Sequence, residues 1–74
     1  MKVKIKLFAS LRKIGPDEQV VELPENAVID DAVTFVKIPQ NIRLLRIVNG
    51  VHRPADYPLK EGDELALFPP IAGG

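Results

Sequence analysis

The strongest constraint on the fold is the alternation of the first eight residues, which read MKVKIKLF. Val3, Ile5 and Leu7 fall on one face and three lysines fall on the other, a period of two that is typical of a strand with one buried face. Phe8 continues the lysine face as an apolar residue. Because the chain has 74 residues and no cysteine, this strand must contribute to a single small core that no disulfide supports.

The next two elements are predicted to be a second strand and a helix. A turn at Gly15-Pro16-Asp17 precedes QVVEL at residues 19–23, so this segment is expected to pair with the first strand as a hairpin. Residues 28–37, VIDDAVTFVK, place apolar residues at helical spacing and two aspartates in the first turn, where the helix dipole favours carboxylates. Pro39 stops this helix. About ten residues are too few for an isolated helix, so it must pack on the sheet.

Three more strands are expected in the second half of the chain. The segment NIRLLRIVNG predicts a third strand, and its Asn49-Gly50 turn leads into a short fourth strand at residues 51–53. A turn at Glu61-Gly62-Asp63 precedes a last strand at residues 64–68. The order ββαβββ predicts an α+β fold of the β-grasp type, with a mixed sheet, one main helix and the first strand beside the last. We expect this domain to span residues 1–68.

The six residues that follow, PPIAGG, are predicted to form an extended tail. Pro69 and Pro70 have no backbone N–H, so they cannot extend the last strand, and they favour a stiff, extended chain. Residues 71–74 would then reach roughly 15 Å from the domain at about 3.3 Å per residue. Gly73 and Gly74 have no Cβ and can enter a channel too narrow for other residues. The tail is therefore suited to placing its terminal carboxylate inside a partner protein.

Composition limits the chemistry that this chain performs alone. Ten basic and ten acidic residues give no net charge, which argues against a nucleic-acid or anionic-membrane partner. No apolar run approaches the ~18 residues of a spanning helix, and the alternating start does not resemble a signal peptide, so a cytoplasmic location is expected. No phosphate-binding loop or metal-ligand cluster is present. A carboxylate that attacks the α-phosphate of ATP must therefore use a partner's magnesium and phosphate site, and the resulting acyl adenylate could accept an amine or a sulfide.

Three stretches, LKEGDELALFPPIAGG, LFASLRK and VNG, resemble the MoaD/ThiS family of ubiquitin-like sulfur carriers. The resemblance implies that Gly74 is adenylated by an E1-like enzyme of the MoeB type and then converted to a thiocarboxylate. It further implies that the tail enters the MoaE-type large subunit of molybdopterin synthase, where sulfur passes to a pyranopterin precursor. In this role the chain is a non-catalytic carrier that binds no cofactor or metal itself. The segment at residues 28–50 is shorter than the family's usual small-subunit segment.

The partner-binding surface is predicted from strand alternation and from the resemblance. Alternation places Phe8 and Phe68 on the face away from the helix, beside the root of the tail, although a minor core under a loop is the alternative for both rings. Arg12 stands where the family has an arginine, and Leu59 is expected to extend the patch. The predicted partner-binding residues are Phe8, Arg12, Leu59, Phe68, Pro69, Pro70, Ile71 and Ala72, with Gly73 and Gly74 at the reacting end.

Other functions fit the same tail. The chain could carry sulfur for thiamine synthesis or tRNA thiolation, or it could be a protein modifier that is joined to lysines through Gly74. A binding module with an inert terminus is a third alternative. The sequence alone does not separate these uses.

Overall fold

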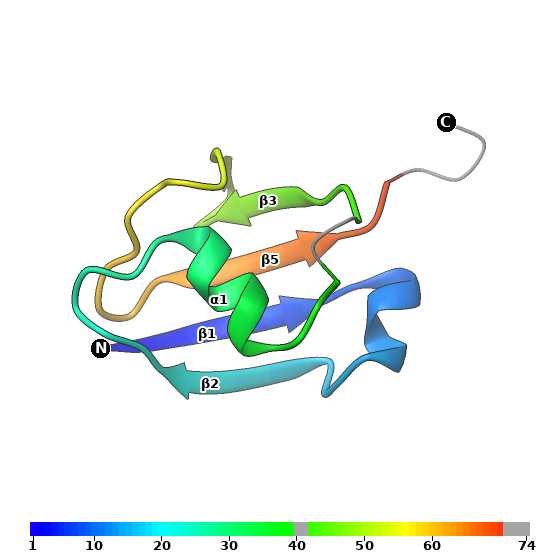
Figure 1. Ribbon diagram of the computed structural model, residues 1–74, viewed down its shortest axis with the longest axis horizontal. Coiled ribbons are helices and arrows are strands. Elements are labelled where there is room, and N and C mark those ends of the chain that lie inside the picture. The colour runs from blue at the N-terminus through cyan, green and yellow to red at the C-terminus, as the bar shows by residue number, and fades with distance from the viewer. Residues whose placement is uncertain (40–41, 71–74) are drawn as a thin grey trace.

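The computed structural model describes residues 1–39 and 42–70, and it consists of a five-stranded sheet with one α-helix across one face (Figure 1). The elements are β1 (Lys2–Leu7), the 3-10 helix η1 (Ala9–Lys13), β2 (Glu18–Glu22), α1 (Ile29–Phe35), β3 (Leu45–Val48), β4 (Val51–His52) and β5 (Glu64–Phe68). The predicted ββαβββ order and β-grasp arrangement are confirmed. The loop predicted between the first two strands contains η1, which buries Leu11.

The sheet places the first strand beside the last, as predicted. Its strand order is β2-β1-β5-β3-β4, and β1 runs parallel to β5 with Ile5 opposite Leu65 and Leu7 opposite Leu67. The other neighbouring strands are antiparallel. Because β1 and β5 run in the same direction, they end at the same side of the sheet. The chain therefore leaves β5 next to the residue that follows β1, which is Phe8 (Figure 1).

One face of the sheet and the inner face of α1 form the core. The helix contributes Ile29, Ala32 and Val33, all buried. The inward residues of β1 and β5 are the most completely buried side chains of the strands: Val3, Ile5, Leu7, Leu65 and Leu67. The opposite face, which we call the open face, carries the alternate residues of the strands and is not covered by α1.

The helix is shorter than predicted because a C-terminal capping motif ends it before Pro39. It was expected to run to Lys37, but it ends at Phe35. The N–H of Ile38 donates to the carbonyl of Val33 over 3.2 Å, and Lys37 adopts a positive φ of 64°. This is the pattern of a Schellman motif, in which an apolar residue after the left-handed position packs back on the helix. Ile38 does so and is 2% exposed.

The third strand is also shorter than predicted, and its partner explains why. β3 begins at Leu45, which pairs with Phe68, the last residue of β5. The pairing of β3 therefore stops where β5 ends.

A hydrogen-bonded turn fixes where β5 begins. Asn49 and Gly50 have positive φ angles of 50° and 85°, as a two-residue hairpin turn requires. The Asn49 amide donates from Nδ2 to the Asp63 carboxylate over 2.9 Å, and its Oδ1 accepts from the N–H of Glu64 over 2.9 Å. Gly62, with φ of 84°, makes the preceding turn. These contacts set the register of β5 and hence the point at which the tail leaves the sheet.

Candidate functional site

Two stacked phenylalanines lie where the chain leaves the sheet. The rings of Phe8 and Phe68 are nearly parallel, with an interplanar angle of 11° and centroids 4.3 Å apart. The neighbouring residues Leu7 and Leu67 point into the core, so strand alternation directs both rings to the open face. The N–H of Phe8 donates to the carbonyl of Leu67 over 3.1 Å and holds the two strands together at this point. The predicted placement of both rings is confirmed, and both are half-buried.

Leu45 adds a third apolar side chain that sequence analysis missed. It lies directly opposite Phe68 in the antiparallel β3–β5 pair, and residues opposite each other share a face of the sheet. Its side chain is 43% exposed. We refer to Phe8, Leu45 and Phe68 as the aromatic patch. Whether Leu44 or Leu45 lies on the open face depends on the register in which β3 pairs with β5. The sequence of apolar residues in this segment does not determine that register.

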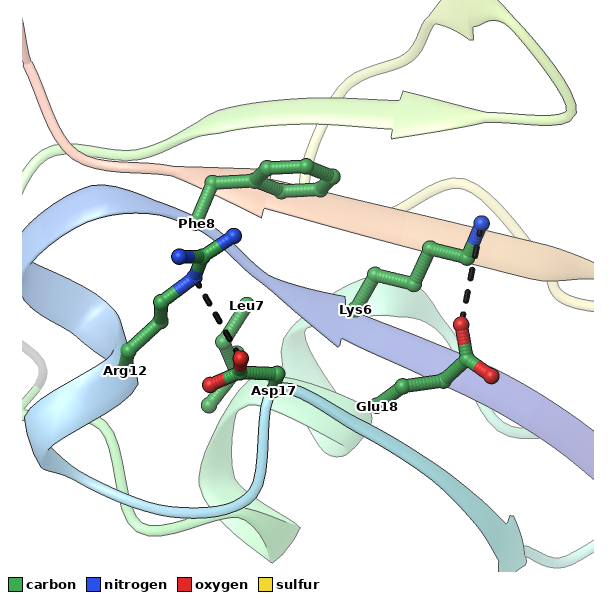
Figure 2. A pocket seen from close by; sticks show the side chains of 6 residues that line it. All are labelled: Lys6, Leu7, Phe8, Arg12, Asp17 and Glu18. Carbon is green, nitrogen blue, oxygen red and sulfur yellow. Dashed lines mark ion pairs between the residues drawn. The ribbon is translucent and has the colours of Figure 1, made fainter.

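Charged residues border the aromatic patch on the β2 side (Figure 2). Arg12 from η1 lies beside Phe8 and pairs with Asp17 over 3.6 Å, while Lys6 pairs with Glu18 over 3.8 Å. These residues line a shallow hollow of about 180 Å³. Both ion pairs are long and solvated, and pairs of this kind contribute little to stability. Lys6 also pairs with Glu64 of β5 over 3.2 Å. The border therefore carries basic and acidic side chains that face one another and remain partly exposed to solvent.

A second hollow lies on the β3 side of the tail root. It has a volume of about 270 Å³ and is lined by Arg43, Leu44, Leu45, Pro69 and Pro70. Its walls are mostly apolar, with one guanidinium. Pro69 and Pro70 thus border the aromatic patch, and the tail begins between two hollows of different chemical character.

The predicted role of Leu59 is wrong. Leu59 is 3% exposed and belongs to the core cluster, so it does not extend the surface patch. Its N–H donates to the carbonyl of Ala27 over 2.9 Å, which ties the loop before β5 to the segment before α1. Leu59 lies in a loop, after Pro54 and Pro58 and before the turn at Gly62. The residues around it follow no helical or strand period, so the sequence does not show which way its side chain points.

Leu59→Ala is therefore expected to act as a core truncation. Loss of a buried leucine side chain should lower the free energy of unfolding by about 2–5 kcal/mol, as measured by urea denaturation. Leu45→Ala is the matched control, because an exposed leucine should cost under about 1 kcal/mol. If the Leu59 variant is as stable as the parent chain but binds the partner more weakly, Leu59 is a partner-binding residue and not a core residue.

The remaining predicted site residues, Ile71, Ala72, Gly73 and Gly74, lie outside the described residues. Within residues 1–39 and 42–70, no three His, Cys, Asp or Glu side chains are grouped so that they could hold a metal ion. The same ranges contain no helix that is long and apolar enough to cross a membrane. The described site thus consists of the aromatic patch, its charged border and the two hollows beside Pro69 and Pro70.

Comparison with known proteins decides the family. The profile of the ThiS family matches residues 5–74. The chain belongs to the ThiS family. This ThiS-family chain is 29% identical over 80 residues to the molybdopterin synthase sulfur carrier subunit of Escherichia coli, with 97% of this chain and 99% of that protein covered. The predicted resemblance is confirmed.

Solved structures agree with this assignment. A putative molybdopterin converting factor subunit 1 from Pyrococcus furiosus is 32% identical, with a TM-score of 0.80 over 96% of this chain and 99% of that one. The small archaeal modifier protein 1 of Haloferax volcanii is 28% identical, with a TM-score of 0.74 over 95% and 98%. The ThiS-family chain therefore has structural relatives named for two different uses of the same fold.

Proposed function

We propose that this chain is a sulfur carrier whose C-terminal carboxylate is converted to a thiocarboxylate for the synthesis of molybdopterin, and that it is the small subunit of molybdopterin synthase. The observation that carries the proposal is the family match, which runs through the tail to residue 74. The similarity to a molybdopterin synthase sulfur carrier subunit over nearly the full length of both chains supports the choice of pathway.

The chemistry takes place on the Gly74 main-chain carboxylate. One carboxylate oxygen attacks the α-phosphate of ATP, pyrophosphate leaves, and an acyl adenylate is formed. A sulfide sulfur then attacks the acyl carbon and AMP leaves, so that the terminus becomes a thiocarboxylate. The thiocarboxylate sulfur then forms a bond to a carbon of the acceptor. Water attacks the acyl carbon and breaks its bond to sulfur, so the sulfur stays on the acceptor and the Gly74 carboxylate is restored. The chain supplies the acyl group, while an adenylating enzyme of the MoeB type binds ATP and Mg²⁺.

The aromatic patch and its charged border form the surface that both partners would bind in this scheme. The two half-buried rings and the exposed Leu45 side chain lose further apolar surface to a partner that covers them, and apolar surface patches mark partner sites. The border carries two basic and two acidic side chains, Lys6, Arg12, Asp17 and Glu18, which a partner with complementary charges of both signs would bind. We propose that the adenylating enzyme and a large subunit of the MoaE type dock here in turn, in the cytoplasm, and that Pro69 and Pro70 direct the tail into each active site.

A protein modifier is the second candidate function. It is favoured by the likeness to the small archaeal modifier protein 1, at a TM-score of 0.74. The activation step would be the same, but a lysine amine would replace sulfide as the nucleophile and produce an isopeptide. The two functions therefore differ in the acceptor and not in the carrier.

Reconstitution with defined acceptors tests the proposal. The thiocarboxylated chain is incubated with a MoaE-type large subunit and the cyclic pyranopterin precursor, and molybdopterin is quantified as its fluorescent oxidation product. We expect molybdopterin to form in proportion to the thiocarboxylate supplied. If the adenylated chain instead forms lysine conjugates and no molybdopterin appears with an active large subunit, the modifier function is correct.

A further inference from the structure

The outer edge of β2 presents unpaired backbone groups in addition to the tail surface. β2 is the first strand of the sheet order, so its inner side pairs with β1 and its outer side faces no other strand of residues 1–39 and 42–70 (Figure 1). The N–H of Leu23 donates to the carbonyl of Met1, and the N–H of Leu7 donates to the carbonyl of Asp17. In this antiparallel register the backbone groups of Glu18, Val20 and Glu22 point outward.

The side chains of these three residues also share one face. Glu18, Val20 and Glu22 alternate with inward residues such as the buried Val21, so they lie on the open face. Val20 is 61% exposed, and the carboxylate side chains of Glu18 and Glu22 are 53% and 68% exposed. The edge therefore offers a row of acidic, apolar and acidic side chains beside free hydrogen-bonding groups. We call this row the β2 edge.

Self-association does not fit the β2 edge. In an antiparallel pair of two copies centred on Val20, Glu18 of one copy would lie opposite Glu22 of the other. In a parallel in-register pair each glutamate would lie opposite itself. Like charges directly opposite each other in a sheet are destabilising. Charge on an edge strand is also a recognised barrier to aggregation. The acidic residues thus exclude a second copy while leaving the edge open to a strand of opposite charge.

We propose that the β2 edge binds a strand of a partner protein in which two basic residues flank an apolar residue at alternate positions. The inner side of β2 already shows this charge pairing. Lys4 and Lys6 of β1 lie on the open face and contact the Glu18 carboxylate over 3.7 and 3.8 Å. Glu22 is paired in the same way with the N-terminal amine of Met1 over 2.8 Å. Both carboxylates are still more than half exposed, so basic side chains of a strand on the outer side would contact them as well. Val20 would pack against its central apolar residue. The added strand would extend the sheet by main-chain hydrogen bonds.

A short peptide tests the proposal directly on the full chain. The peptide Thr-Lys-Thr-Val-Thr-Lys-Thr is titrated into ¹⁵N-labelled protein, and amide shifts and hydrogen exchange are measured. We expect shifts and slowed exchange at the outward amides of Glu18, Val20 and Glu22, and little change at the already bonded amide of Val21. The same peptide with Glu in place of both Lys should bind at least about tenfold more weakly, with the difference falling at high salt.

Two protein variants separate the backbone and charge contributions. Val20→Pro removes an outward N–H that β1 does not use, so the fold should persist while binding is lost. Glu18→Gln should weaken binding several-fold, whereas Asp56→Asn, which makes the same change in an exposed loop, should not. Binding that survives Val20→Pro in the folded protein would overturn the proposal. So would shifts confined to the aromatic patch, equal binding of both peptides, or concentration-dependent pairing of the protein with itself at these amides.

Discussion

Gly73→Ala is expected to abolish sulfur transfer without affecting the stability of the fold. A methyl group at position 73 would have to pass through a channel in the partner that is proposed to fit only glycine, and overlap of a Cβ with backbone atoms cannot be relieved by rotamer changes. The core consists of residues that precede the tail, so the free energy of unfolding should stay within about 0.5 kcal/mol of the parent chain. Single-turnover transfer to the pyranopterin precursor, measured beside urea unfolding, provides both values.

Deletion of Gly74 and addition of one residue after it are the companion changes. Both shift the terminal carboxylate by one residue, about 3.3 Å, which is far more than productive geometry tolerates. Pro70→Ala serves as a matched control, because it alters the tail without adding bulk at its end and should reduce transfer only partly. Normal transfer by Gly73→Ala would refute the narrow channel while leaving the thiocarboxylate chemistry intact.

Phe8→Ala and Phe68→Ala are each expected to weaken binding to the adenylating enzyme or the large subunit by more than about tenfold. Each truncation removes the apolar area that its ring presents to the partner, worth about 25 cal/mol per Å², and also breaks the stack that positions the other ring. Tenfold weaker binding corresponds to about 1.4 kcal/mol lost from these two contributions together. Stability should fall by less than about 2 kcal/mol, because both rings lie outside the core cluster, are only half-buried and lose mainly their mutual stack. Calorimetric titration and urea unfolding measure the two effects.

The fold supplies a matched control for these variants. Phe35 lies on α1, which covers the other face of the sheet, and its side chain is 53% exposed. Phe35→Ala removes the same chemical group and should leave partner binding unchanged. If Phe8→Ala and Phe68→Ala strongly destabilise the domain while the folded fraction binds normally, the two rings are a minor core and not a docking surface.

The sequence predicted the buried face of β1, the end of β5 and the positions of the turns, because strand alternation and turn-forming residues determine these features. The period of two in MKVKIKLF identifies the buried face of β1, and the prolines after Phe68 fix the end of β5 at the predicted residue. Together they predict that Phe8 and Phe68 lie at the same corner of the sheet. Asn49-Gly50 and Gly62 adopt the positive φ angles that such turns require. Each of these features is decided by residues close to one another in the chain.

Features that depend on distant partners were missed. Leu59 lies in a loop without periodicity, and its burial follows from packing between the core and the Ala27 segment. Leu45 and Leu44 look equivalent in the sequence, and only pairing with β5 directs Leu45 to the aromatic patch. Val20 appears to be a normal apolar residue of a strand until the sheet order shows that its strand is at an edge. Register and strand order are tertiary properties, and local propensity does not contain them.

The thiocarboxylate itself provides the most direct test of the proposed function. The purified chain is incubated with ATP, Mg²⁺, a MoeB-type enzyme of demonstrated activity and a sulfur source, and its intact mass and C-terminal fragment are measured. We predict that the mass rises by the difference between one sulfur and one oxygen, that the increase lies on Gly74, and that omission of ATP prevents it. An unchanged mass, or an added sulfur at any other residue, would contradict the proposed function.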